Sequence, residues 1–125
     1  MATKLTQTGV QKIIANLFGT ALTAPTYLGW GTGSTAAAVT DTTLQTPSAE
    51  ARTNGTGSKI TTTFSNDTLQ VVGTITAAGG QTVSEVGLFD ASSSGNMYVH
   101  GVFTGIVLAT GDAIAFTVTI QITTT

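Results

Sequence analysis

Charge and cysteine are the features that this sequence of 125 residues has least of. Charged residues make up 8% of the chain, against about 25% in an ordinary globular protein. Its four basic residues are scattered, whereas nucleic-acid binding needs clustered Lys and Arg, so we expect no nucleic-acid partner. With no cysteine in the chain, the sequence does not indicate a redox compartment.

Long hydrophobic runs are also absent, although 41% of the residues are hydrophobic. No stretch approaches the roughly 18 consecutive apolar residues of a membrane helix. The polar N-terminus does not resemble a signal peptide, and we expect no membrane partner. Because the apolar residues recur periodically, disorder is also disfavoured. The length suits a single domain, residues 1–125, with its own core.

Patterns that carry chemistry are missing too. The chain has one histidine, His100, no G-x-S-x-G sequence, and six carboxylates scattered along its length. Two carboxylates brought together by the fold would be the one route to hydrolysis. No calcium loop is present, and residues 29–33 lack the Gly-Lys-Ser/Thr ending of a phosphate loop. We therefore expect no enzyme, no catalytic residue, no metal and no cofactor, and we expect His100 at the surface or in an interface.

Threonine takes the place of charge, because the chain has 28 Thr and 15 Gly. Threonine is β-branched and suits the half-exposed face of a strand, so it can make a polar sheet surface without charge. Such a surface, with a formal net charge of −2, does little to keep copies of a protein apart in solution. This composition favours a structural protein that lies against other protein surfaces.

One segment, residues 8–18, has a helical pattern. Its apolar residues recur at i, i+3, i+4, i+7 and i+8, which makes a single stripe. Thr6 or Thr8 can cap the helix start, and Gly19 can end it. We predict a helical N-terminal arm within residues 1–20, with its stripe packed on its own domain or against a neighbouring subunit. The stripe consists of Val10, Ile13, Ile14, Leu17 and Phe18.

From residue 26 onward the sequence is typical of short strands separated by turns. We predict an all-β fold, an antiparallel β-sandwich resembling a jelly roll, over residues 26–125. Residues 34–46 are expected to be an irregular loop, and residues 54–57, Asn-Gly-Thr-Gly, a hairpin turn. The strands are expected over residues 26–31, 49–53, 59–64, 69–76, 81–89, 96–104 and 113–124.

The last of these strands has the most regular alternation of apolar and polar residues. Ile114, Phe116 and Val118 alternate with Ala115, Thr117 and similar small or polar residues. A strand this regular and uncharged is an aggregation hazard at a sheet edge. We therefore expect it to be central in its sheet or paired with another chain.

Two side chains stand out as structural candidates. Glu85 shares a predicted strand face with apolar residues, so it needs a partner, and Arg52 is the best available, with Lys59 second. We predict a Glu85–Arg52 ion pair that fixes strand register. Trp30 lies between glycines and is expected as a core or interface anchor. The alternative is a sugar-stacking platform at a fibre tip, formed by Trp30, Tyr27 and Tyr98.

Several motifs, in order along residues 27–122, resemble a recurrent pattern in small structural proteins of phage virions. This pattern is shared by head-associated and tail-fibre-like members, and it implies a β-sandwich that forms homotrimers. Phe116 departs from it, because a Trp is often found there. The motifs are Tyr27-Leu28-Gly29-Trp30-Gly31-Thr32-Gly33, Thr40-Asp41-Thr42 with Leu44, Glu50-Ala51-Arg52, Val72-Gly73-Thr74-Ile75, Val83-Ser84-Glu85-Val86-Gly87-Leu88-Phe89-Asp90, Met97 and Thr110-Gly111-Asp112.

The resemblance to capsid decoration (cement) proteins implies a protein on the capsid surface of the virion, made in the host cytoplasm. Its partners would be itself and the major capsid protein, whose shell it would stabilise. The alternative is a tail or fibre-tip module that binds host-surface glycans. For the protein interface we predict the helical stripe, Trp30 and Tyr98, together with the Thr-rich C-terminal end.

Overall fold

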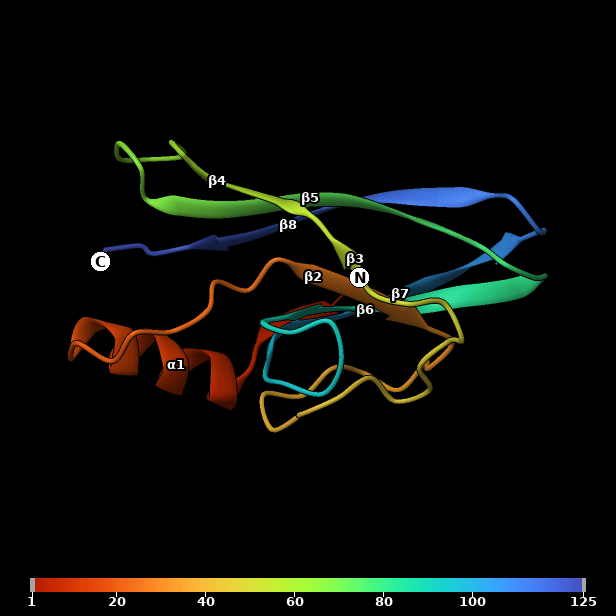
Figure 1. The fold of residues 1–125 in the computed structure, drawn as a ribbon, viewed down its shortest axis with the longest axis horizontal. Coiled ribbons are helices and arrows are strands. Elements are labelled where there is room, and N and C mark those ends of the chain that lie inside the picture. The colour runs from red at the N-terminus through yellow and green to blue at the C-terminus, as the bar shows by residue number, and fades with distance from the viewer. Residues whose placement is uncertain (1, 125) are drawn as a thin grey trace.

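Two antiparallel β-sheets and one short helix make up the computed structural model, which describes residues 2–124 (Figure 1). Sheet A has the strand order β1-β7-β6-β2-β3, and sheet B has the order β4-β5-β8. The predicted antiparallel all-β sandwich with a short N-terminal helix is confirmed. The elements are β1 (Ala2–Leu5), α1 (Gln7–Leu17), β2 (Tyr27–Gly31), β3 (Thr53–Asn54), β4 (Thr56–Ile60), β5 (Thr68–Thr76), β6 (Gln81–Phe89), β7 (Met97–Leu108) and β8 (Ala113–Gln121).

The main core lies between the two sheets because their strands alternate apolar and polar residues. On β8, Phe116 and Val118 are buried while Thr117 and Thr119 are exposed. The rings of Trp30 and Phe116 meet edge to face across the two sheets, with centroids 6.4 Å apart. The core residues are Leu28, Trp30, Val71, Ile75, Ala77, Val83, Leu88, Tyr98, Val99, Leu108, Phe116 and Val118.

The helix α1 has the start and stop that its sequence predicts. The Thr6 hydroxyl accepts a hydrogen bond of 3.0 Å from the N–H of Gly9, and so caps the first turn. Gly19 follows the last turn with φ of 102°, a conformation that a side chain disfavours. The observed helix begins one residue before the predicted segment and ends one residue before its end.

The N-terminal arm is only partly helical. Residues 2–5 form β1, which pairs antiparallel with β7 so that Lys4 lies opposite His100. The prediction of a helical arm within residues 1–20 is therefore corrected to a strand followed by a helix. Four residues carry too little pattern to predict a strand, and the free edge of β7 supplies the hydrogen bonds that form it. Met1 lies outside the described residues.

The predicted hairpin around residues 54–57 is wrong. β3 ends at Asn54 and pairs with β2 of sheet A, whereas β4 begins at Thr56 and pairs with β5 of sheet B. Gly55 joins the two sheets, and a Cβ at this position would lie 2.7 Å from the carbonyl oxygen of Val72. The glycine marks a close approach of two backbones here, a role that its sequence context does not separate from a turn.

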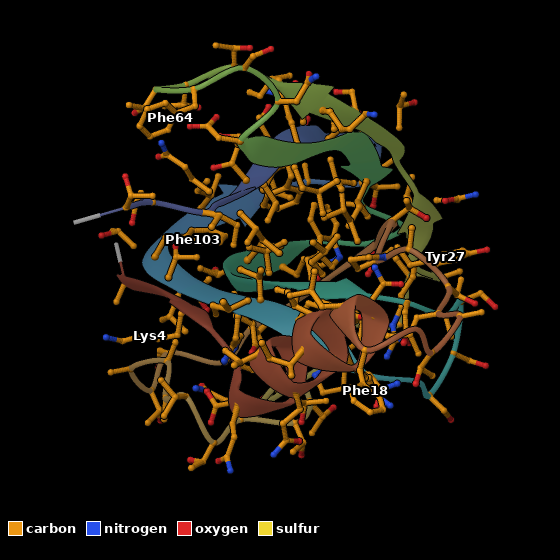
Figure 2. The ribbon with its side chains drawn as sticks, turned by 90° about the vertical axis from the view of Figure 1, so that its left-hand side faces the viewer. Lys4, Phe18, Tyr27, Phe64 and Phe103 are labelled. Atoms are coloured by element: carbon orange, nitrogen blue, oxygen red, sulfur yellow. The ribbon has the colours of Figure 1, made fainter. Side chains whose placement is uncertain are left out.

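The second strand of that predicted hairpin also ends early. β4 stops at Ile60, and the chain then turns around Asp67. The Asp67 carboxylate accepts the N–H groups of Thr62, Thr63 and Phe64 at 2.9, 2.9 and 3.0 Å. Phe64, predicted as the last residue of a strand, therefore lies in a loop with 53% of its surface exposed (Figure 2).

The outer face of sheet A is covered by α1 and by a long irregular loop, residues 32–52, which we call the covering loop. Figure 1 shows both on the side of sheet A that faces away from sheet B. A second, smaller core lies on this face, where Leu44 of the loop packs with Phe89, Met97 and Tyr27. Irregular segments of this length are uncommon in compact domains and are often functional.

Candidate functional site

The helix α1 turns most of its apolar stripe outward. Ile14 is 58% exposed, Leu17 is 77% exposed and Phe18 is 92% exposed. Val10 is also exposed, and Ile13 is half-buried. Phe18 projects from the C-terminal end of the helix in Figure 2. The predicted stripe therefore exists, and its own domain leaves most of it uncovered. Contiguous exposed apolar side chains of this size are typical of an interaction surface.

A fixed set of backbone contacts holds α1 in place. The Thr6 N–H donates to the carbonyl of Tyr98 at 2.8 Å, and its buried hydroxyl donates to the carbonyl of Met97 at 2.5 Å. Gln7 N–H donates to the carbonyl of Val39 in the covering loop at 2.7 Å. Gly9 lies directly against β7, because a Cβ there would be 2.7 Å from the Tyr98 carbonyl oxygen. The apolar stripe is thus presented on a rigid support.

A pocket of about 400 Å³ continues the apolar surface between α1 and sheet B. Ile13 and Leu17 line it from the helix, and Leu69 and Ile120 line it from β5 and β8. Ile122, which follows β8, adds a further apolar side chain that is 59% exposed. The C-terminal end of the described chain therefore lies beside the helix, and the two predicted contact segments adjoin each other.

Glu85 is a buried carboxylate with four hydrogen-bond partners. Its side chain has no exposed surface, yet both carboxylate oxygens accept hydrogen bonds. Donors are the backbone N–H groups of Gly33, Gln45 and Thr46, at 3.0, 2.9 and 2.8 Å, and Nε2 of His100 at 2.9 Å. Three of the four donors belong to the covering loop, so Glu85 fastens this loop to sheet A.

His100 is buried, which corrects the expectation of a surface or interface residue. Its Nδ1 lies 2.6 Å from a carboxylate oxygen of Asp41, and its Nε2 lies 2.9 Å from Glu85. Each ring nitrogen therefore has a carboxylate as its partner. With both nitrogens occupied, the imidazole links the covering loop to sheet A.

The predicted Glu85–Arg52 ion pair does not form. Arg52 instead donates to the carbonyls of Ala91 and Ser94, at 2.9 and 2.7 Å. Its guanidinium carbon lies 3.4 Å from the centre of the Phe89 ring. Glu85 did need a partner, as its sequence context indicates, but a bulge between Val83 and Glu85 puts the carboxylate on the outer face of sheet A.

Trp30 and Tyr98 are both buried in the core, so Trp30 takes the first of its two predicted roles, and Tyr98 also lines the apolar pocket beside α1. The indole N–H of Trp30 donates to the Glu50 carboxylate at 3.0 Å. Neither ring is placed to stack on a sugar at the surface. The two glycines beside Trp30 serve the covering loop, since a Cβ at Gly31 would collide with the Thr46 carbonyl and with Glu85.

Acid is expected to destabilise this protein through its hydrogen-bonded carboxylates. Burial acts to raise the pKa of Glu50, but hydrogen bonds from Trp30, Ala78 and Gln81 outweigh it and lower the pKa from 4.5 to about 2. Burial likewise opposes the N–H groups and His100 around Glu85, whose pKa also ends below 4.5. The backbone N–H of Ala38 is the main cause of a lowered pKa at Asp41.

These shifts set the direction of the pH effect. A lowered pKa in the folded state means that the unfolded chain binds more protons as the pH falls through this range, so the stabilisation is present above pH 4.5 and is lost toward pH 2. We expect the urea midpoint to be level near neutrality and to fall steadily below about pH 4.5. Urea titrations followed by circular dichroism at several pH values would measure this. An unchanged midpoint at about pH 3 would contradict it.

No group of three or more His, Cys, Asp and Glu side chains within residues 2–124 is arranged to hold a metal ion. In the same part of the chain, no helix has the length and apolar character needed to cross a membrane. The contacts of Glu85 and His100 hold the covering loop on sheet A, and the exposed face of α1 is the candidate site for a partner. The link between His100 and Asp41 joins residues 59 positions apart, and no motif spacing in the sequence signals it.

Comparison with known proteins adds one family. A family model described as podophage GP4 fiber I protein gp80 matches residues 4–124. The chain belongs to this family. No curated protein and no solved structure matches the chain.

Membership of the gp80 family confirms the coarser part of the resemblance found in the sequence. The chain is a structural protein of a phage virion, as the ordered motifs of residues 27–122 indicate. The family description names a fibre, so it does not specifically support decoration of the capsid. The exposed face of α1 and the apolar pocket beside it are thus surfaces of a virion protein.

Proposed function

We propose that this chain is a component of a phage fibre and that it joins other virion proteins through the exposed apolar face of α1. The fibre description of its family supports the location. The outward-facing Ile14, Leu17 and Phe18 support the mode of contact, and they are the observation that carries it. The role is structural, with no catalytic step.

The face of α1 has the properties of a docking helix. Val10, Ile14 and Leu17 stand at i, i+4 and i+7 and form one row, which is how an amphipathic helix fits an apolar groove. Lys12 is the only charged residue in α1, so little charge has to be desolvated when a partner covers this face. Because hydrogen bonds to β7 and the covering loop already fix the helix, docking costs little further ordering.

Charge introduced on this face is expected to prevent docking without unfolding the protein. The double variant Leu17→Glu with Phe18→Glu removes two apolar anchors, each contributing about 1.5–3 kcal/mol when buried. We expect incorporation into purified particles, measured by quantitative mass spectrometry, to fall by about tenfold or more. Thermal unfolding of the isolated protein should change little, since both residues are exposed.

Phe64→Glu is the matched control for this experiment. Phe64 is also a large exposed apolar residue, but it lies on the loop after β4, and Figure 2 shows it at the opposite end of the view from Phe18. The control is expected to be incorporated like the unmodified protein. Normal incorporation of the double variant would overturn the assignment of the docking face to α1.

Decoration of the capsid surface, with the major capsid protein as partner, is the second candidate. The motifs of residues 27–122 support it, since they resemble a pattern that head-associated virion proteins share with tail-fibre-like ones. The number of copies in purified particles separates the two candidates. A number that tracks the major capsid protein would select the capsid, and a small number that tracks the tail components would select the fibre.

Binding of host glycans is not part of the proposal. The aromatic residues expected to stack on sugars include Trp30 and Tyr98, and both are buried. Tyr27 is half-buried and packs with the smaller core under the covering loop. Glycan binding that disappeared on Trp30→Phe, with the fold intact, would reverse this view.

A further inference from the structure

The strand β8 forms an edge of sheet B, and within residues 2–124 its one pairing partner is β5. Its nine residues contain no charge, no proline and no glycine, and its register with β5 has no bulge. An exposed edge strand displays unpaired N–H and C=O groups that attract another strand, and proteins normally protect such edges. β8 carries none of the usual protections.

The other strands that end a sheet in the described part of the chain, β1, β3 and β4, are protected. β1 has four residues including Lys4, and β3 has two residues. β4 has five residues and carries Lys59. Shortness and lysine are both common ways to prevent edge-to-edge pairing. The contrast singles out β8 as the edge that is left open for a strand.

The direction of the β8 backbone groups follows from its ends. The N–H of Ile122 donates to the carbonyl of Asp67 at 3.0 Å, and the N–H of Ala77 donates to the carbonyl of Asp112 at 2.7 Å. Hydrogen-bonded and non-hydrogen-bonded pairs alternate in an antiparallel ladder. Even-numbered residues of β8 therefore bond to β5, and odd-numbered residues direct their N–H and C=O groups away from β5. The odd-numbered residues are Ala113, Ala115, Thr117, Thr119 and Gln121.

The sandwich is also open beside this edge. A groove of about 760 Å³ lies between β8 and sheet A, lined by apolar side chains that include Phe103, Phe116 and Ile120. β1 covers β7 over residues 99–102, so residues 103–108 of β7 have no described partner on this side. Val107 in this segment is 80% exposed. Figure 2 shows Phe103 on the side where the blue strands β7 and β8 face each other.

We propose that β8 pairs with a strand edge of a second copy of this chain, so that copies join through main-chain hydrogen bonds and cover this groove. The outward side chains of β8 are alanine, threonine and glutamine, so two copies meet without repulsion between like charges. Two open edges, β8 and the end of β7, lie on the same side of each copy. The surface is distinct from the α1 stripe, and the proposal does not rest on the function assigned to α1.

Proline at Thr117 tests the proposal directly. Its outward N–H is removed, while the hydrogen bonds of Phe116 and Val118 to β5 remain, and proline is tolerated at such edge positions. Sedimentation velocity over a range of concentrations is expected to show the unmodified protein as an oligomer. Thr117→Pro is expected to sediment as a monomer, or to associate with a dissociation constant at least about tenfold higher.

Thr117→Val is the matched control, because it changes the side chain and keeps the N–H. It should associate like the unmodified protein, and circular dichroism should show the same fold in all variants. Thr119→Pro, which also removes an outward N–H, is the second variant should Thr117→Pro not fold. The helix variant Leu17→Glu with Phe18→Glu is expected to leave association unchanged.

Three results would overturn the proposal. One is an unmodified protein that stays monomeric at every concentration tested. Another is an oligomer that persists in folded Thr117→Pro and Thr119→Pro alike. The third is an oligomer that dissociates in the helix variant but not in the proline variants, since the contact between copies would then lie on α1.

Discussion

Replacing Glu85 by alanine is expected to lower the free energy of unfolding by about 3–5 kcal/mol. The change leaves three backbone N–H groups and the His100 ring without their shared acceptor, which is fully buried in the folded protein. A domain of this size is stable by about 5–15 kcal/mol in total. The loss is therefore a large fraction of the stability of the fold.

Urea unfolding followed by circular dichroism would measure this effect. Hydrogen exchange adds a local readout, since the amides of Gly33, Gln45 and Thr46 should lose protection before the strands do. Thr82→Ala is the matched control, because Thr82 lies on the same strand and is exposed. Its effect should stay within about 0.5 kcal/mol. An equally small effect of Glu85→Ala would contradict the fastening role.

Trp30→Ala is expected to cost about 3–5 kcal/mol, the range for removing a large aromatic side chain from a core. The indole lies between the two sheets, and its loss removes the edge-to-face contact with Phe116 and the hydrogen bond to Glu50. Trp30→Phe keeps a ring in the cavity and should cost less. This prediction also separates a core residue from a sugar-stacking residue, whose removal would leave stability unchanged.

Circular dichroism is the suitable probe for these variants, because Trp30 is the one tryptophan of the chain and its removal abolishes the fluorescence signal. Leu17→Ala serves as the control for loss of a large apolar side chain at an exposed position. We expect its effect to be within about 0.5 kcal/mol. A Trp30→Ala protein as stable as this control would show that the indole is not part of the core.

Local periodicity predicted the regular elements well. The predicted bounds of residues 81–89 match β6, and the bounds of α1 differ from the prediction by one residue at each end. Alternation also predicted β8, although it ends at Gln121 rather than at residue 124. These elements succeed because their patterns arise from one face packing on the core, a property that neighbouring residues in the chain share.

The prediction of site residues was partly right and partly wrong. The apolar stripe of α1 was identified, with two alternatives for its partner, and the structure leaves most of it exposed. For Trp30 the sequence left a core and an interface role open, because a flanking glycine fits an interface anchor as well as a core residue, and the structure places the indole in the core. Glu85 was recognised as needing a partner, but Arg52 was chosen from charge alone. Hydrogen bonds from loop N–H groups leave no trace in charge or spacing.

By itself the sequence determined an all-β sandwich with one helix, a surface poor in charge, and a family of phage virion proteins. The tertiary structure alone decided that Glu85 meets His100 and Asp41, that Gly55 crosses between sheets, and that β8 lies at an edge. The reason is physical: the two kinds of property depend on different distances along the chain. Strand and helix patterns extend over a few residues, whereas partners of a buried charge and the order of strands are chosen by contacts between distant segments.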